Sequence, residues 1–181
     1  HDLSESLVPA APATASAPRV RTLLVCDIAD STALVERLGD SAAAELIRRH
    51  DRGARDLLHR HGGREIDKTD GFLALFERPV EAVAFALEYQ RVLRALSESS
   101  RQPLRARVGI HVGEVVVWEN SAADVAEGAK SLDVEGLAKP VAARLMSLAL
   151  PGQILLSGVA FSLAQRAEGE LDMPGMVRWL T

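Results

Sequence analysis

The chain has 181 residues, of which 48% are hydrophobic and 25% are charged, and its formal net charge at pH 7 is −4. This length predicts one domain with a hydrophobic core, and the composition is that of a globular protein rather than a disordered or fibrous one. The negative charge argues against a nucleic-acid binder that works by neutralising phosphates. No run approaches the roughly 20 apolar residues that cross a bilayer, so we expect no membrane contact by this domain.

Cys26 is the one cysteine of the chain. A single thiol cannot form an internal disulfide, and no zinc-ligand spacing surrounds it, so we interpret Cys26 as a core residue. A lone thiol is compatible with a reducing compartment, and the N-terminus lacks the basic and apolar regions of a signal peptide. We therefore expect a cytoplasmic location.

The first half of the chain predicts a strand, two helical stretches and a hairpin. Residues 1–18 are rich in Pro, Ala and Ser and lack periodicity, which is typical of a flexible leader or linker. The apolar run 21–28 predicts a buried strand, and Asp30-Ser31-Thr32 supplies helix N-cap candidates. Helical spacing then continues to Gly62-Gly63. Asp70-Gly71 is a strong hairpin signal, with strands expected over 64–69 and 72–76.

The second half predicts helices and strands in alternation. Pro79 is placed to open a long helix, because proline is favoured in a first turn. A strand is expected over 105–118, where Gly109 and Gly113 indicate a bend or the close approach of another backbone. Residues 119–132 are polar, and we interpret them as an irregular insertion or an arm. A helix over 140–148, a strand over 154–156 and a helix from about Val159 complete the chain.

The order of these elements is β-α-α-β-β-α-β-α-β-α. Strands joined both by a hairpin and by helical crossovers indicate a mixed sheet with helices packed on it. We therefore predict an α+β fold with a ferredoxin-like βαββαβ core and additional helices and strands, as one domain over residues 19–181.

Two aspartates lie where strands end. Asp27 closes the first strand, and Asp70 lies at the tip of the hairpin, so both carboxylates share one edge if these strands are neighbours. Such a pair, with no His or Cys cluster nearby, suits a hard cation such as Mg²⁺ or Mn²⁺. Residues 28–32 open a helix, whose first N–H groups favour phosphate. The residues alone thus predict a metal–phosphate site, although Asp at a strand end and Asp-Gly turns are also common structural features.

Four segments resemble, in order and spacing, the motifs of class III adenylate and guanylate cyclases. The similarity spans about residues 20–165 and implies a cyclase catalytic domain of bacterial type over residues 19–181. The family closes with a hairpin that carries a phosphate-binding lysine, and we expect this hairpin to be missing here. The four segments are 23–32 (LLVCDIADST), 62–76 (GGREIDKTDGFLALF), 107–115 (RVGIHVGEV) and 141–157, from VAARL to PGQILLS.

The resemblance implies roles for individual residues. Asp27 and Asp70 would hold two divalent metal ions, Mg²⁺ or Mn²⁺, with the carbonyl of Ile28 as a further ligand. Arg144 would stabilise charge on the α-phosphate. Lys68 and Asp133 resemble an adenine-selecting pair, so the implied reaction converts ATP to 3′,5′-cyclic AMP and pyrophosphate. The implied substrate-binding residues are Lys68, Asp133, Ala29, Asp30, Ser31 and Thr32.

The chain departs from the family pattern near the base-selecting lysine. Lys68 lies two positions before Asp70, whereas the family places this lysine four positions before. Asp67 or Glu65 could therefore face the base instead.

A second departure falls on the position of the family's transition-state asparagine, which here is Pro140. Proline has no side chain that forms hydrogen bonds, and the neighbouring Lys139 could compensate. Two alternatives stay open: a degenerate cyclase fold that binds nucleotide or only dimerises as a regulatory module, and a guanylate cyclase, against which Lys68 and Asp133 argue.

The resemblance also implies a homodimer. Each site would take the metal aspartates from one protomer and Lys68, Asp133 and Arg144 from the other. The insertion 119–132 could serve as a dimer arm or form a disordered loop. Sensor or effector domains are expected elsewhere in the full-length protein.

The histidines carry no site in this interpretation. The spacing of His50, His59 and His61 fits no standard metal site, so we place them on a solvated face. His111 falls within a strand, and we interpret it as a packing residue.

Overall fold

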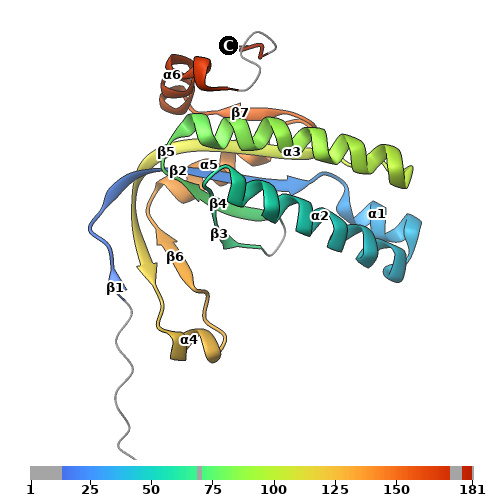
Figure 1. Cartoon of the computed structure of the whole chain (residues 1–181), viewed down its shortest axis with the longest axis horizontal. Helices are drawn as coiled ribbons and strands as arrows, with labels where there is room; N and C mark the ends of the chain where they lie inside the picture. Colours follow the sequence, from blue (N-terminus) through green and yellow to red (C-terminus); the bar gives the residue numbers. More distant parts are fainter. Residues whose placement is uncertain (1–13, 69–70, 172–176, 181) are drawn as a thin grey trace, which may run out of the picture.

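The computed structural model describes residues 14–68, 71–171 and 177–180, and it shows a mixed sheet with helices on both faces (Figure 1). The order β5-β2-β4-β3, with every neighbour antiparallel, is that of a ferredoxin-like core, so the predicted fold class is confirmed. These strands are β2 (Arg19–Ile28), β3 (Arg64–Asp67), β4 (Phe72–Phe76) and β5 (Ala106–Glu119).

Three further strands pair with β5. β7 (Ile154–Leu156) runs parallel to its first half, whereas β1 (Thr14–Ala15) and β6 (Leu132–Glu135) pair antiparallel with its far end. Residues 14 and 15 belong to the segment that we assigned to a flexible leader, and the register pairs them with Glu119 and Trp118. The prediction for residues 1–13 lies outside the described residues.

Two groups of helices cover the two faces of the sheet (Figure 1). α1 (Ser31–Leu38), α2 (Asp40–Arg60), α3 (Pro79–Ser100) and α6 (Gly158–Arg166) pack on one face, and α5 (Ala138–Leu148) packs on the other. A short 3₁₀ turn, η1 (Glu168–Glu170), follows α6. Among the described residues, no helix combines the length and the apolar character that crossing a membrane requires.

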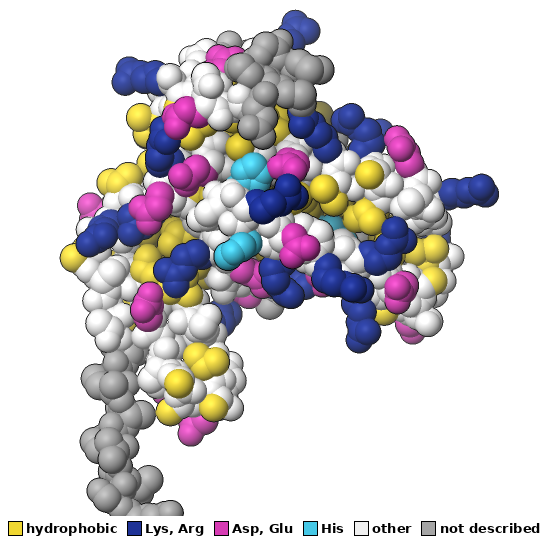
Figure 2. Space-filling view, in the orientation of Figure 1, with side chains coloured by type: hydrophobic (Ala, Val, Ile, Leu, Met, Phe, Trp, Pro, Cys, Tyr) yellow, Lys and Arg dark blue, Asp and Glu magenta, His cyan; other side chains and the backbone are white. Residues whose placement is uncertain are grey.

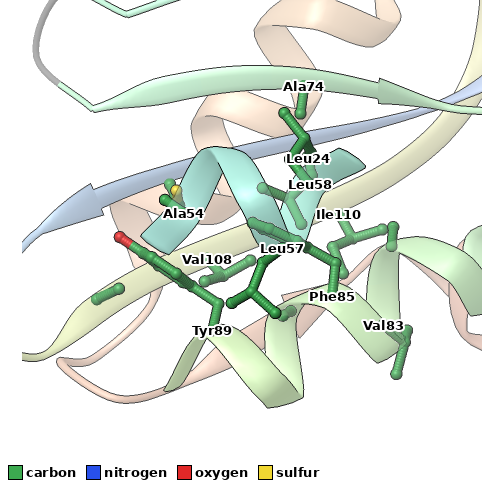
Figure 3. Packing of buried hydrophobic residues seen from close by; sticks show 14 of the residues in the cluster. Leu24, Ala54, Leu57, Leu58, Ala74, Val83, Phe85, Tyr89, Val108 and Ile110 are labelled. Atoms are coloured by element: carbon green, nitrogen blue, oxygen red, sulfur yellow. The ribbon is translucent and has the colours of Figure 1, made fainter. Parts of the chain in front are cut away.

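The larger core lies between the sheet and the helices α2 and α3 (Figure 3). Phe72 of β4 and Phe85 and Tyr89 of α3 form ring contacts with centroid distances of 5.6–5.7 Å. Burying a large apolar side chain stabilises the fold by about 1.5–3 kcal/mol. Cys26 is buried in the same cluster, as predicted.

α5 lies directly on the backbone of β5. A Cβ atom at Gly109 would be 2.4 Å from the backbone nitrogen of Met146 and 2.5 Å from the carbonyl oxygen of Ala142. The predicted close approach at Gly109 is therefore confirmed, because only glycine leaves room for this contact. α5 is thereby held at a fixed position on the sheet.

Residues 119–132 form part of an arm that extends from the sheet (Figure 1). The arm consists of the far ends of β5 and β6 with the short helix α4 (Ala122–Ala126) between them. The hydroxyl of Ser121 accepts a hydrogen bond from the backbone N–H of Asp124 at 3.1 Å and caps α4. The segment is therefore ordered and is not the disordered loop of one alternative, whereas its predicted role as a dimer arm stays a prediction.

Candidate active site

A cavity of about 240 Å³ opens where β2 ends and α1 begins. Asp27 and Ile28 come from the end of β2, Ser31 from the first turn of α1, and Asp51 from α2. Lys68, which follows β3, also lines the cavity, as do the polar side chains of His50 and Tyr89. The predicted site residue Asp70 lies outside the described residues, so its position relative to Asp27 is not described.

Arg107 holds the carboxylate of Asp27. The register of β2 and β5 places the two residues directly opposite each other. Nε of Arg107 donates to Oδ1 of Asp27 at 3.0 Å, and Nη2 donates to Oδ2 at 2.6 Å. These hydrogen bonds raise the pKa of Arg107 above its already high ordinary value. Arg107 lies within the motif 107–115, but the sequence predicts no role for it, because its partner follows only from the strand register.

The described donors at this site fit a hard divalent cation. A carboxylate has about four lone-pair positions, of which the two hydrogen bonds from Arg107 use two, so Asp27 keeps capacity for a metal. The backbone carbonyl of Ile28 is an oxygen donor of the kind that Mg²⁺ and Mn²⁺ accept. Within residues 14–68, 71–171 and 177–180, no group of three or more His, Cys, Asp or Glu residues surrounds a single point.

The segment predicted to bind phosphate forms the start of α1. Asp30 is the N-cap residue, in a left-handed conformation with φ of 56°, and its side chain makes no capping hydrogen bond. The N–H of Ala29 already donates to the carbonyl of Arg105 at 2.8 Å, so it is not available for a ligand. Ser31 lines the cavity, and Thr32 is exposed beside it.

Asp67 and Lys68 lie on opposite faces of the sheet. Nζ of Lys68 bonds to Oδ2 of Asp51 on α2. Asp67 accepts a hydrogen bond from Nζ of Lys130 at 2.6 Å. It also lines a second cavity of about 210 Å³, against α5, together with Lys139. Of the two alternatives predicted for the base-facing residue, Asp67 lies on the α5 side, whereas Glu65 pairs with Ala74 and lies near Arg55 of α2.

A buried polar network supports Asp51. Oδ1 of Asp51 lies 3.0 Å from Nδ1 of His50, and Nε2 of His50 lies 2.6 Å from the hydroxyl of Tyr89. Burial lowers the pKa of His50 and raises that of Tyr89, so both are neutral near pH 7. For neutral His50, these partners assign the proton to Nδ1, which donates to Asp51, and make Nε2 the acceptor of the Tyr89 hydroxyl.

The network corrects the prediction for the histidines. His50 is 7% exposed and lies inside the larger core rather than on a solvated face. His61 is partly buried, and its Nε2 lies 2.7 Å from Oε2 of Glu88. His50 lies four residues from both Leu46 and Ala54 on the buried stripe of α2, so helical spacing is the signal that could have placed it inside. His59 is exposed, as predicted.

The comparisons with known proteins assign this arrangement to a family. The chain matches the family model described as the adenylate and guanylate cyclase catalytic domain over residues 16–178. The chain belongs to this cyclase family.

Solved cyclase structures resemble the domain along most of its length. The guanylyl cyclase Cya2 is 26% identical, with a TM-score of 0.74 over 83% of this chain and 81% of that chain. Adenylate cyclases from Trypanosoma brucei include a structure that is 28% identical, with a TM-score of 0.68 over 84% and 80%. The adenylyl cyclase CyaB from P. aeruginosa, at 23% identity and a TM-score of 0.73 over 83% and 84%, shows the same fold.

A curated relative matches most of the chain. The uncharacterized protein Rv0891c of Mycobacterium tuberculosis is 31% identical over 145 residues, which cover 78% of this chain. The match covers 44% of the length of Rv0891c, so this cyclase domain corresponds to less than half of that relative.

The remaining predicted residues of the cyclase domain lie on α5 and on the arm. Arg144 is exposed on α5, and Asp133 on β6 accepts a hydrogen bond from Nδ2 of Asn120 at 2.9 Å. Neither is among the described residues that line the cavity of Asp27. Pro140 is the third residue of α5, where the backbone has no helical acceptor for an N–H, so the helix keeps its hydrogen bonds.

Charge on the cyclase domain is mixed over the face drawn in Figure 2, where basic and acidic side chains are interspersed.

His111, predicted as a packing residue, is partly buried, and its Nδ1 lies 2.8 Å from the hydroxyl of Ser157. This contact joins β5 to the start of α6.

Proposed function

We propose that this cyclase domain converts ATP to 3′,5′-cyclic AMP and pyrophosphate, as a homodimer with two divalent metal ions, Mg²⁺ or Mn²⁺. The observation that carries the proposal is the cavity at the end of β2, where an oxygen-donor ligand and the first turn of a helix meet. When bound, the metal ions acidify the ribose 3′-hydroxyl and neutralise phosphate charge. In the reaction, the 3′-oxygen bonds to the α-phosphorus, the bond to pyrophosphate breaks, and the hydroxyl proton passes to solvent.

Different groups of the chain would bind the metal ions, bind the phosphates and stabilise the developing charge. Asp27, oriented by Arg107, and the carbonyl of Ile28 would hold the metal. The free N–H groups at the start of α1 would face the phosphates. Arg144 of the second protomer would stabilise the charge that develops on the α-phosphate.

Two features support a site completed by a second copy. The cavities of about 240 and 210 Å³ are each smaller than the roughly 300–1,000 Å³ of sites that hold a whole ligand. In addition, the exposed side of α5 that carries Arg144 is apolar: Val141 is 41% exposed and Leu148 is 58% exposed, at helical steps of three and four from Arg144. Apolar side chains that gather on a surface are typical of a contact with another protein.

The base would be recognised on the α5 side of the sheet. The second cavity is mostly apolar, as a purine ring requires, and it holds the carboxylate of Asp67 and the ammonium of Lys139. A carboxylate accepts from the adenine amino group, and an ammonium donates to a ring nitrogen. We therefore assign to Lys139 the donor role predicted for Lys68, and keep Asp133 as a further acceptor.

GTP is the second candidate substrate, because the same pair of side chains can also bind guanine. The N1–H and amino groups of guanine can donate to the Asp67 carboxylate, while its O6 accepts from Lys139.

A regulatory domain that binds nucleotide or dimerises without turning it over is the alternative to an enzyme. Pro140 favours this alternative, because proline has no side chain that forms hydrogen bonds. The buried thiol of Cys26 suits the cytoplasmic location that we infer.

The test is turnover by the purified domain, concentrated enough to dimerise, with Mn²⁺ and either ATP or GTP. Cyclic AMP that disappears in the Asp27→Ala variant supports the proposal. Predominant cyclic GMP keeps the cyclase reaction and overturns the choice of base. No product with either nucleotide, from a domain shown to be dimeric, contradicts turnover and favours a regulatory module.

A further inference from the structure

We propose that Lys68 binds the phosphate chain of the nucleotide rather than its base, and that Asp51 positions it. This inference rests on the proposed function, because it names a contact within the same site. The resemblance to the cyclase family implied instead that Lys68 binds the purine base.

A β-bulge in β3 determines where Lys68 lies. Arg64 pairs with Leu75 and Glu65 with Ala74, but Asp67 pairs with Leu73, so the bulge leaves Ile66 without a paired residue. A bulge places one extra residue on one strand and changes which side later side chains face. Ile66 and Asp67 therefore both lie on the α5 side. Lys68, the next residue, turns to the α2 side and reaches Asp51.

The surroundings of Lys68 suit a phosphate better than a purine. The cavity it lines also contains Asp27, Ile28 and Ser31, the residues assigned to the metal and to the helix start. The apolar cavity that suits a ring lies on the other face, and Lys68 is not among its described lining residues. An ammonium is a compact charge with three donors, of which the contact with Asp51 uses one, so two remain for phosphate oxygens.

Asp51 is held too firmly to be only a surface partner. Its side chain is 20% exposed, and its second oxygen is fixed by His50, which is in turn fixed by Tyr89. A long lysine side chain has many rotamers, and an anchored carboxylate reduces the number that it samples. The chain Tyr89–His50–Asp51 thus aims Lys68 into the cavity of Asp27, and Asp51 acts as a positioning residue.

The experiment separates phosphate binding from base binding by measuring two fragments of the substrate. Isothermal titration calorimetry gives the affinity of the whole domain for inorganic tripolyphosphate with Mg²⁺, and for adenosine. For Lys68→Gln we expect tripolyphosphate affinity to fall about ten-fold and adenosine affinity to stay unchanged. Lys68→Arg should recover most of the affinity, since it keeps the charge. Lys130→Gln is the matched control, because Lys130 also pairs with an aspartate but on the other face.

Asp51→Asn tests the positioning role. It should weaken tripolyphosphate binding by about three-fold, less than Lys68→Gln, because the ammonium stays but loses its anchor. In the variant that lacks Lys68, the Asp51→Asn substitution should have no further effect on tripolyphosphate affinity. Equal effects of Asp51→Asn with and without Lys68 would show that Asp51 acts independently and would overturn this part of the proposal.

Two further outcomes separate the inference from the proposed function. If Lys68→Gln loses adenosine affinity and keeps its tripolyphosphate affinity, Lys68 binds the base and the inference is overturned. A wild-type domain that binds no tripolyphosphate also overturns the inference. A wild-type domain that binds tripolyphosphate through Lys68 but makes no cyclic nucleotide contradicts the proposed function and supports the inference.

Discussion

The carboxylate of Asp27 receives two hydrogen bonds from the guanidinium of Arg107, its direct neighbour across β2 and β5. The side chain of Asp27 is 16% exposed, so its charge depends on a partner inside the protein. In the proposed cyclase site the same carboxylate binds a metal ion. Arg107 therefore orients the Asp27 carboxylate and also competes with the metal ion for its negative charge.

Substitution of Arg107 tests this double role. We expect Arg107→Gln to lower the free energy of unfolding by about 1–3 kcal/mol in a chelator, because Asp27 loses charged hydrogen bonds. Mn²⁺ should then raise the melting temperature more in this variant than in the wild type, since no cation competes at Asp27. Thermal unfolding with EDTA and with Mn²⁺ measures both effects. Arg21→Gln, which removes the exposed pair with Glu77, is the control, and an equal Mn²⁺ shift in all three proteins would contradict competition.

Mixing two inactive variants tests the composite site. Asp27→Ala and Arg144→Ala should each lose nearly all cyclase activity, because each removes one half of both sites. When the two proteins are mixed, heterodimers contain one intact site, and random exchange should restore roughly a quarter of wild-type activity. Cyclic nucleotide formation by each variant and by the mixture measures this. No recovery in a mixture shown to contain heterodimers would place both residues in one protomer's site.

The pH dependence of stability tests the burial of His50. Burial lowers the pKa of His50 below its ordinary value of 6.5, so the unfolded chain takes up a proton at a higher pH than the folded domain does. As the pH falls below about 6.5, the unfolded state is favoured and stability decreases. Urea unfolding between about pH 7.5 and 5.5 should show this loss, with a smaller slope in His50→Gln. His111, whose pKa burial also lowers, accounts for part of the remaining slope.

The matched control for this measurement is His59→Gln, because His59 is exposed on the same helix. This variant should keep the wild-type pH profile. The same slope in His50→Gln as in the wild type would show that His50 is not buried in solution.

Gly71 is expected to tolerate no side chain. Its φ is 147°, and a Cβ atom there would lie 2.0 Å from the carbonyl oxygen of Cys26. Gly71→Ala should therefore separate β4 from β2 and lower the free energy of unfolding by about 2–4 kcal/mol. Gly158→Ala is the control, since no atom lies within 4 Å of its Cβ position. Chemical denaturation compares the two, and equal stability would contradict the close approach.

The order of the main elements could be predicted from the sequence because each has a strong local signal. The apolar run before Asp27 and the Asp-Gly turn signal of the hairpin predict the strands, and Pro79 marks the start of α3. β1, β6 and α4 were missed or left as an irregular insertion. They are two to five residues long, too short for periodicity to show, and the two strands form only because β5 offers a partner.

The ferredoxin-like core, the family resemblance and the position of Asp27 at a strand end all follow from the amino-acid sequence alone. Which way neighbouring side chains of the site face follows from tertiary contacts instead. The bulge at Ile66 separates Asp67 from Lys68, and the strand register joins Arg107 to Asp27. Each outcome depends on a partner far away in the chain, and local spacing carries no information about such a partner.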